Sequence, residues 1–91
     1  MERNIHEAQN KLYIGNQQNP DAQMIFETDR GTMKILSTEV APKLREQGIG
    51  NELIDYAVNY ARKHKLMIDP VCSFAGKVME ETPEYQVVLE K

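Results

Sequence analysis

Two stretches in the amino-terminal half alternate apolar and polar residues, as strands with one buried face do. Residues 11–15, "KLYIG", predict a short strand. Residues 22–40, "AQMIFETDRGTMKILSTEV", alternate on both sides of a polar "DRG" turn and predict an antiparallel hairpin. Turn chemistry in "QNPD", residues 18–21, separates the two stretches. The side chains expected on the buried face of the hairpin are Ala22, Met24, Phe26, Met33 and Ile35.

The hydrophobic period changes after residue 50. Apolar residues then recur three or four positions apart, which predicts an amphipathic helix that buries Leu53, Ile54, Ala57, Val58 and Ala61. "LMID", residues 66–69, predicts a short buried strand, and "SFAGKVMEE", residues 73–81, a brief helix. The apolar "YQVVL", residues 85–89, fits either a last strand or a docked tail. This order of elements predicts a single α/β (or α+β) domain over residues 1–91.

Composition narrows the class of protein further. The chain has 91 residues, 41% hydrophobic and 27% charged, which suits a globular domain with a thin core. A net charge of −3 argues against nucleic acid as a partner, because phosphate neutralisation needs surplus Lys and Arg. No apolar run is long enough to span a membrane, and the polar amino terminus does not resemble a secretory signal.

The single cysteine and the two histidines bear on compartment and metal binding. Cys72 has no internal partner for a disulfide, so we expect a reducing compartment, the cytoplasm. His6 and His64 are far apart in the sequence and show no ligand spacing with Cys72, so no metal site is expected. We expect both histidines to be exposed.

Candidate chemistry lies in "VAPKLREQGIG", residues 40–50, between the hairpin and the helix. The start of a helix carries backbone N–H groups without internal partners and a partial positive charge. Glycines before it allow close approach of an anion and positive φ, and Arg45 adds a guanidinium suited to phosphate oxygens. The loop therefore predicts a phosphate or pyrophosphate cradle. A tight connection with a purely structural purpose is the alternative.

This segment resembles the acyl-CoA loop of the GNAT superfamily of N-acetyltransferases. The signature is Arg or Gln, two residues, Gly, one residue, then Gly or Ala, and it reads here Arg45, Glu46, Gln47, Gly48, Ile49, Gly50. "DPVCSF", residues 69–74, and "TPEY", residues 82–85, also resemble a subgroup of minimal, single-domain GNAT-like proteins. The resemblance implies a minimal GNAT-like acyl-CoA N-acyltransferase fold. That fold has a mixed, mostly antiparallel sheet, one long helix and short C-terminal helices.

The same resemblance implies the cofactor, CoA or acetyl-CoA, and the residues that bind it. Backbone N–H groups from Arg45 to Gly50 would hold the CoA pyrophosphate. The strand edge from Thr38 to Val40 would pair with the pantetheine arm, as a peptide adds to a sheet. In such folds that strand splays from the next one, and the thioester lies in the opening near Cys72. The chain departs from the subgroup at Ser37 and Thr82, where His is frequent, and at Glu46, where Gly is frequent.

Acyl transfer needs a nucleophile and a base, and the chain offers few of each. Cys72 is the best catalytic candidate, as a thiol beside the acyl group, with a small core residue as the alternative. Glu39 could act as general base, directly or through water, or be an ordinary exposed carboxylate of the strand. Tyr85 could donate a proton to the leaving thiolate, but we expect it to anchor the C-terminal segment.

The resemblance thus implies an acetyl-CoA-dependent acetyltransferase acting on a small amine or peptide amine. A non-catalytic module that binds CoA or acyl-CoA is the main alternative. A third reading makes the glycine loop structural and the domain a protein-binding one. The acceptor amine cannot be read from the sequence.

Overall fold

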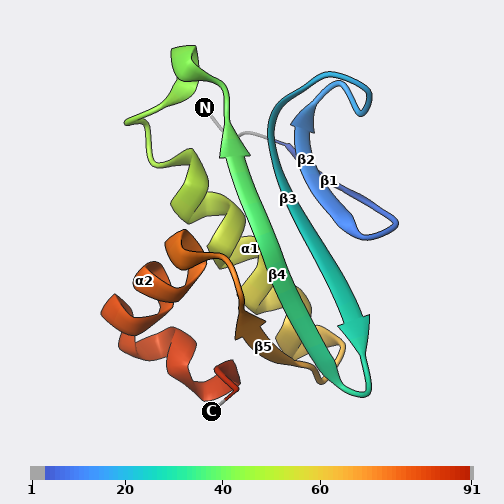
Figure 1. Ribbon diagram of the computed structural model, residues 1–91, viewed down its shortest axis with the longest axis vertical. Coiled ribbons are helices and arrows are strands. Elements are labelled where there is room, and N and C mark those ends of the chain that lie inside the picture. The colour runs from blue at the N-terminus through green and yellow to red at the C-terminus, as the bar shows by residue number, and fades with distance from the viewer. Residues whose placement is uncertain (1–3, 91) are drawn as a thin grey trace.

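The computed structural model describes residues 4–90, which build around one five-stranded sheet in the order β1-β2-β3-β4-β5 (Figure 1). The first four strands form an antiparallel meander, whereas the fifth pairs parallel with β4. The sheet is therefore mixed and mostly antiparallel, as predicted. Its strands are β1 (Ile5–Ala8), β2 (Lys11–Gly15), β3 (Pro20–Asp29), β4 (Thr32–Val40) and β5 (Met67–Pro70).

One long helix connects the two parallel strands. α1 (Ile49–Lys63) follows β4 and a short 3-10 helix, η1 (Pro42–Leu44), and packs against β3, β4 and β5. It lies behind the sheet in Figure 1. A shorter helix, α2 (Ser73–Glu81), and a 3-10 helix, η2 (Pro83–Val88), follow β5 and pack beside it and against α1.

The core lies between the sheet and α1 and extends under α2. All five apolar side chains predicted for the hairpin are buried, and so are all five predicted for α1. Ile49 joins them with 1% of its surface exposed, so α1 buries its first residue as well. Ala75 and Met79 carry the same core beneath α2. The alternation and the helical period of the sequence thus located the core correctly.

Two segments differ from what the sequence pattern predicted, and a third had been left open between two alternatives. β1 was not predicted, because its "IHEA" has no regular alternation of buried positions. Pro20 and Asp21 begin β3 instead of forming a turn, and the preceding bend is held by the Asn16 side chain, which accepts from the Gln18 N–H at 2.8 Å. Residues 85–89, predicted as either a last strand or a docked tail, are not a regular strand: they form most of η2, which packs against α1 and α2, and end in one isolated bridge, between Ile68 and Leu89.

A β-bulge interrupts the pairing of β3 and β4. Phe26 pairs with Ile35 and Ile25 with Ser37, so Leu36 is an extra residue on β4. Such a bulge bends the strand and increases its twist. It also reverses the alternation, because Thr38 and Val40 now pair with the buried Met24 and Ala22. This bend lies one residue beyond the end of the β4–β5 pairing.

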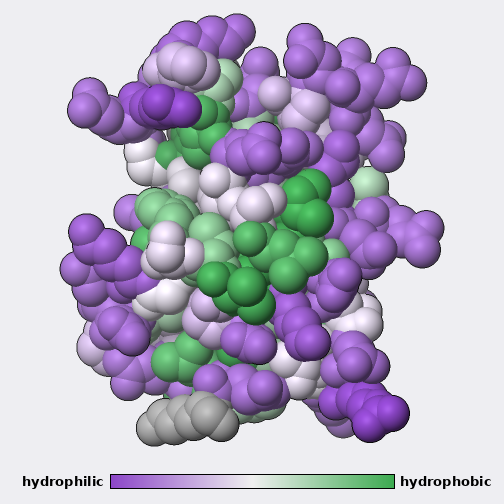
Figure 2. Space-filling view, in the orientation of Figure 1, coloured by the Kyte–Doolittle hydropathy of each residue, from purple (hydrophilic) through white to green (hydrophobic). Residues whose placement is uncertain are grey.

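The sheet face turned away from α1 is exposed to solvent over part of its width. Figure 2 shows this face, with apolar residues gathered near its middle and polar residues around them. Leu36 and Val71, both exposed, are among the large apolar side chains on the surface of the described chain. No helix within residues 4–90 is both long and apolar enough to cross a membrane.

Candidate active site

The site forms where β4 continues beyond its partner β5. The parallel pairing ends at Ile35 and Pro70, and the Cys72 N–H then donates to the Ile35 carbonyl at 2.9 Å. From there to Val40, β4 pairs with β3 but with no other strand of residues 4–90. The two parallel strands therefore splay apart, as the resemblance implied.

The backbone of β4 presents polar groups to this opening. In an antiparallel pair, residues alternate between pointing their N–H and C=O groups toward the partner and away from it. The Ala41 N–H donates to the Asp21 carbonyl at 2.8 Å, so it points toward β3. The backbone groups of Val40 and Thr38, which lie in alternate register, consequently point away from β3 and into the opening.

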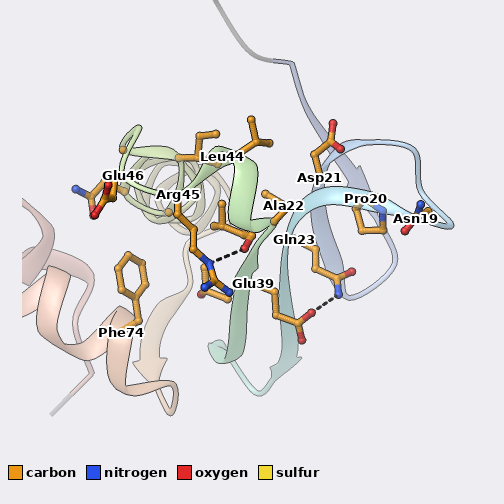
Figure 3. Close-up of a pocket in the computed structure, with 17 residues that line it drawn as sticks. Asn19, Pro20, Asp21, Ala22, Gln23, Glu39, Leu44, Arg45, Glu46 and Phe74 are labelled. Carbon is orange, nitrogen blue, oxygen red and sulfur yellow. Dashed lines mark hydrogen bonds between the residues drawn. The ribbon is translucent and has the colours of Figure 1, made fainter.

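An open cleft of about 900 Å³ occupies this space. Its walls are the end of β4, the start of β3, the loop before α1, the first turn of α1 and the Phe74 ring (Figure 3). The cleft brings together most of the site residues predicted from sequence, with Gln47 and Cys72 outside its lining: Thr38, Glu39, Val40, Arg45, Glu46, Gly48, Ile49 and Gly50.

The loop from η1 to α1 is built so that its backbone faces the cleft. Gly48 caps α1 in the left-handed region, with φ of 75°, and makes no side-chain cap hydrogen bond. The N–H groups of the first helical turn, starting at Ile49, have no acceptor within the helix itself. Because the Ile49 side chain is in the core, this residue offers only its backbone to a ligand. These donors and the helix dipole make the loop attractive to an anion.

Arg45 also lines the cleft, but its side chain folds back onto the strand. Its Nε donates to the Val40 carbonyl at 3.2 Å, as Figure 3 shows. Its backbone N–H donates to the Pro42 carbonyl at 3.3 Å and closes η1. The guanidinium therefore holds the loop to the end of β4 and occupies one of the two carbonyls that the strand presents to the opening.

Gln47 differs from its neighbours in the motif. Its side-chain amide donates to the Lys43 carbonyl at 3.3 Å, so it ties the loop together. Glu46 has φ of 67°, a left-handed conformation that glycine adopts more easily. The frequent glycine at this position of the subgroup thus has a conformational reason.

Cys72 lies at the edge of the site, at the start of α2. It is the N-cap residue of that helix and is half-buried. Its thiol donates to the Thr38 hydroxyl, with 3.9 Å between Sγ and Oγ1. Because Thr38 lines the cleft, Cys72 is one side chain removed from it. The thiol is accordingly neither a wholly buried core residue nor a part of the cleft wall.

Glu39 lies on the opposite side of β4 from Thr38. Its carboxylate accepts from the Gln23 side-chain amide at 3.1 Å, across the β3–β4 pair (Figure 3). Ser37 shares that face, as strand alternation predicted, since both pair with residues of β3 on that side. No hydrogen bond joins Glu39 to Cys72 within the described chain, so the two candidate catalytic residues do not form a pair here.

Tyr85 is directed away from the cleft and anchors η2 to α1. Its hydroxyl donates to the Asp55 carboxylate at 2.9 Å. Burial, and then this hydrogen bond, raises the pKa of Tyr85 to about 12. Tyr56 makes a similar contact with Glu7 of β1, and that hydrogen bond is the main cause that raises the pKa of Tyr56 to about 12. Both histidines are exposed, as expected.

Two parts of the cleft wall were not predicted from the sequence. One is the start of β3, where residues 19–23 face the loop. The predicted hairpin placed residues 22 and 23 beside the end of β4, but residues 19–21 fell in the stretch predicted as a turn, so their place in the wall was not foreseen. The other is Phe74, which belongs to the "PVCSF" stretch that carried the family resemblance and had no role assigned to it.

The fold matches solved N-acetyltransferase structures. An NMR structure of a GCN5-like candidate N-acetyltransferase from Staphylococcus aureus is 34% identical, with a TM-score of 0.82, over 96% of this chain and 87% of that one. An IAA acetyltransferase from Bacillus cereus, at 19% identity and a TM-score of 0.57, aligns with 78% of this chain and 51% of its own. The ribosomal-protein-S18-alanine N-acetyltransferase from Escherichia coli shares the fold at 13% identity, with a TM-score of 0.63 and coverages of 82% and 53%.

The class is therefore that of an N-acetyltransferase domain. The family model of the GCN5-related N-acetyl-transferases matches residues 11–88, and the chain belongs to this family. The two distant structures extend well beyond the matched part, since it covers about half of each. A search among curated proteins gave no match.

Proposed function

We propose that this protein transfers the acetyl group of acetyl-CoA to a small amine or peptide amine, in the cytoplasm. The observation that carries the proposal is the cleft itself, where a glycine-bounded helix start and an unpaired strand edge face the same opening. The first suits a pyrophosphate and the second suits the amides of a pantetheine arm. Family membership supports the choice of acetyl-CoA as donor.

In this proposal the loop from Arg45 to Gly50 holds the CoA pyrophosphate, chiefly through backbone N–H groups. Arg45 leaves the Val40 carbonyl when CoA binds and turns its guanidinium toward a phosphate oxygen. The carbonyl thus released, together with the backbone of Thr38, pairs with the pantetheine amides. Only a side chain moves in this exchange, so the loop is formed before the ligand arrives.

The chemistry is assigned to Cys72 and Glu39. The Cys72 sulfur attacks the thioester carbonyl, a new S–C bond forms as the bond between that carbon and the CoA sulfur breaks, and CoA leaves as a thiol with the proton that Cys72 gives up. The nitrogen of the acceptor amine then attacks the carbonyl of acetyl-Cys72, an N–C amide bond forms as the Cys72 S–C bond breaks, and the thiol is restored with a proton from the amine. Glu39 takes part in moving that proton, directly or through water, because it lies in the cleft from which the amine approaches.

The test is a titration of the ¹⁵N-labelled protein with CoA, followed by amide shifts. We expect the largest shifts in residues 45–50 and along the Thr38–Val40 edge, with a rise in melting temperature that follows CoA concentration. Saturating CoA without a shift in either segment would refute the site. Shifts confined to α2 and η2 would place the ligand elsewhere.

The second candidate function is a module that binds CoA or acyl-CoA without turnover. One observation favours it: the two candidate catalytic residues lie on opposite sides of β4. Glu39 accepts a hydrogen bond from Gln23 on one side. Cys72 donates to the Thr38 hydroxyl on the other. Release of free CoA from acetyl-CoA in the presence of an amine panel, followed with a thiol reagent, separates the two functions. Steady release that depends on the amine supports transfer, whereas tight binding without release supports the module.

A further inference from the structure

Phe74 is a large aromatic side chain with no role in the acyl-transfer steps described above. It lies in the first turn of α2, two residues after Cys72, and 39% of its surface is exposed. Its ring forms one wall of the cleft (Figure 3). In that view the ring points from α2 toward the start of α1 and lies across the cleft from β4.

The ring is seated against Gly50. A Cβ atom added at Gly50 would lie 2.7 Å from Cζ of Phe74, closer than real Cβ atoms come, and 3.0 Å from Cε2, which is tighter than most. The backbone of Gly50 does not require glycine, since it is within α1 and its φ is not positive. Gly48 is the reverse case, because its φ is 75° and a Cβ there would meet nothing within 4 Å. The second glycine of the motif thus makes room for the Phe74 ring.

The ring also stands between the two ends of the proposed reaction path. On one side is the start of α1, where the pyrophosphate is proposed to bind, and on the other is Cys72. The arm of CoA that joins a pyrophosphate to a thioester has to cross the distance between them. It carries two amides and a gem-dimethyl group, so it suits a polar strand edge on one side and an apolar wall on the other.

We propose that Phe74 is a positioning residue for the pantetheine arm, which lies between its ring and the Thr38–Val40 edge. The glycine at position 50 sets where the ring stands. This inference rests on the proposed function, since it assumes CoA as the ligand. The inference adds a residue, Phe74, that contacts the pantetheine arm and does not contact the phosphates of CoA.

The test compares CoA with 3′-phosphoadenosine 5′-diphosphate, which is CoA without its pantetheine arm. Phe74→Ala should weaken CoA binding by about tenfold, as expected when an apolar contact with the arm is lost. Binding of the armless nucleotide should change less than about twofold, because the loop is intact. Phe74→Leu should lie between wild type and Phe74→Ala for CoA. Val87→Ala, an exposed apolar residue outside the cleft lining, serves as the control and should bind both ligands as wild type does.

A second variant tests the packing of the Phe74 ring against Gly50. Gly50→Ala should displace the ring at little cost in melting temperature, because the atoms it meets are at the far end of a partly exposed side chain. It should weaken CoA binding in the wild-type background and have almost no further effect in Phe74→Ala. The two substitutions should therefore be strongly non-additive for CoA and leave the armless nucleotide unaffected.

The outcomes separate this inference from the function on which it rests. If the armless nucleotide binds and Phe74→Ala leaves CoA affinity unchanged, the arm does not use the ring, and only the present inference is wrong. If Gly50→Ala weakens both ligands equally in both backgrounds, Gly50 serves the phosphates and not the ring. If neither CoA nor the nucleotide binds the wild-type protein, the proposed function fails and this inference fails with it.

Discussion

Two helices begin at the candidate site, and they offer it different things. α1 starts on Gly48, with a left-handed backbone, open space where a side chain would be and no side-chain cap. α2 starts on Cys72, in an ordinary extended conformation, and places a thiol and the Phe74 ring near the cleft. The first helix start offers backbone donors, and the second offers side chains.

The two helix starts should therefore respond differently to substitution, since one depends on backbone conformation and the other on side chains. At α1 the geometry depends on torsion angles that few residues adopt, so substitutions should act through backbone strain. At α2 the backbone is unstrained, so substitutions should act through the lost atoms alone. The proposed division of labour follows: α1 and its loop bind the common phosphate part of the donor, and α2 positions and attacks its reactive end.

The largest expected effect is on catalysis, at the start of α2. Cys72→Ser should lower amine-dependent acetyl transfer by about 100-fold or more, because the hydroxyl is a far weaker nucleophile than the thiol. CoA affinity should be unchanged. Incubation of the wild-type protein with acetyl-CoA should leave a transient acetyl group on Cys72, detected by intact mass.

Stability distinguishes this role from that of a core residue. Cys72 is an N-cap without a side-chain cap hydrogen bond, and serine is among the preferred residues at such a position. We therefore expect the melting temperature of Cys72→Ser to be equal to or above that of wild type. A less stable protein with full activity and no acetyl adduct would assign Cys72 to the core.

The next largest effect is expected at the start of α1. Gly48→Val should destabilise the fold by about 1–2 kcal/mol, since an L-residue in the left-handed region costs that much and valine tolerates it poorly. It should also abolish CoA binding by moving the first N–H groups of α1. Thermal unfolding and the CoA titration measure the two consequences.

Gly48→Asn is the matched variant, because asparagine enters the left-handed region readily. The space around Gly48 is open, so the added side chain has nothing to displace. We expect it to retain most of both stability and affinity. If valine and asparagine behave alike, backbone conformation is not what this glycine provides.

Much of the fold could be predicted from the sequence, and the exceptions have physical reasons. The hairpin and α1 bury enough apolar residues at regular spacing to reveal their periods. β1 does not, because only its first and last residues are partly buried. The bulge at Leu36 could not be predicted, since one unpaired residue leaves no mark in an apolar stretch. It places Glu39 on the sheet face turned away from α1, whereas unbroken alternation from Met33 would direct Glu39 toward α1.

The parts of the candidate site that depend on backbone conformation could be predicted from the sequence, and the parts that depend on contacts between distant residues could not. Glycine spacing indicated the loop, because few residues substitute for glycine there. The predicted hairpin placed residues 22 and 23 beside the end of β4, whereas residues 19–21 were predicted within a turn, so their part in the cleft wall was missed. Gly50 was predicted as a point of approach for an anion. Its actual neighbour is Phe74, 24 positions later in the sequence, so that contact could not be inferred from the local pattern.

A smaller effect is expected from Arg45, which belongs to the α1 side of the comparison but acts through its side chain. Its guanidinium already has a partner in the Val40 carbonyl, so binding of CoA exchanges one hydrogen bond for another. Arg45→Ala should therefore weaken CoA binding by only about 1 kcal/mol, roughly fivefold. The loss should diminish at high salt, because the residue is exposed.

Arg45→Lys provides the control, since it keeps the charge and removes the Nε–H that donates to Val40. If charge alone matters, the lysine variant should bind CoA nearly as wild type does. If the tie to β4 matters more, both variants should melt earlier and bind equally weakly. A CoA affinity in Arg45→Ala equal to that of wild type would remove this residue from the proposed site.

The smallest effect is expected at Glu46, where strain and charge act in the same direction. Its φ of 67° is costly for glutamate, while glycine adopts it freely but loses more entropy on folding. The balance should make Glu46→Gly more stable by about 0.5 kcal/mol. Removing a carboxylate beside the proposed pyrophosphate site should also tighten CoA binding slightly at low salt and not at high salt.

Glu46→Gln separates the two causes, because it removes the charge and keeps the strain. Weaker CoA binding in both variants would mean that the carboxylate itself contacts the ligand, and the start of α1 would then depend on a side chain just as α2 does.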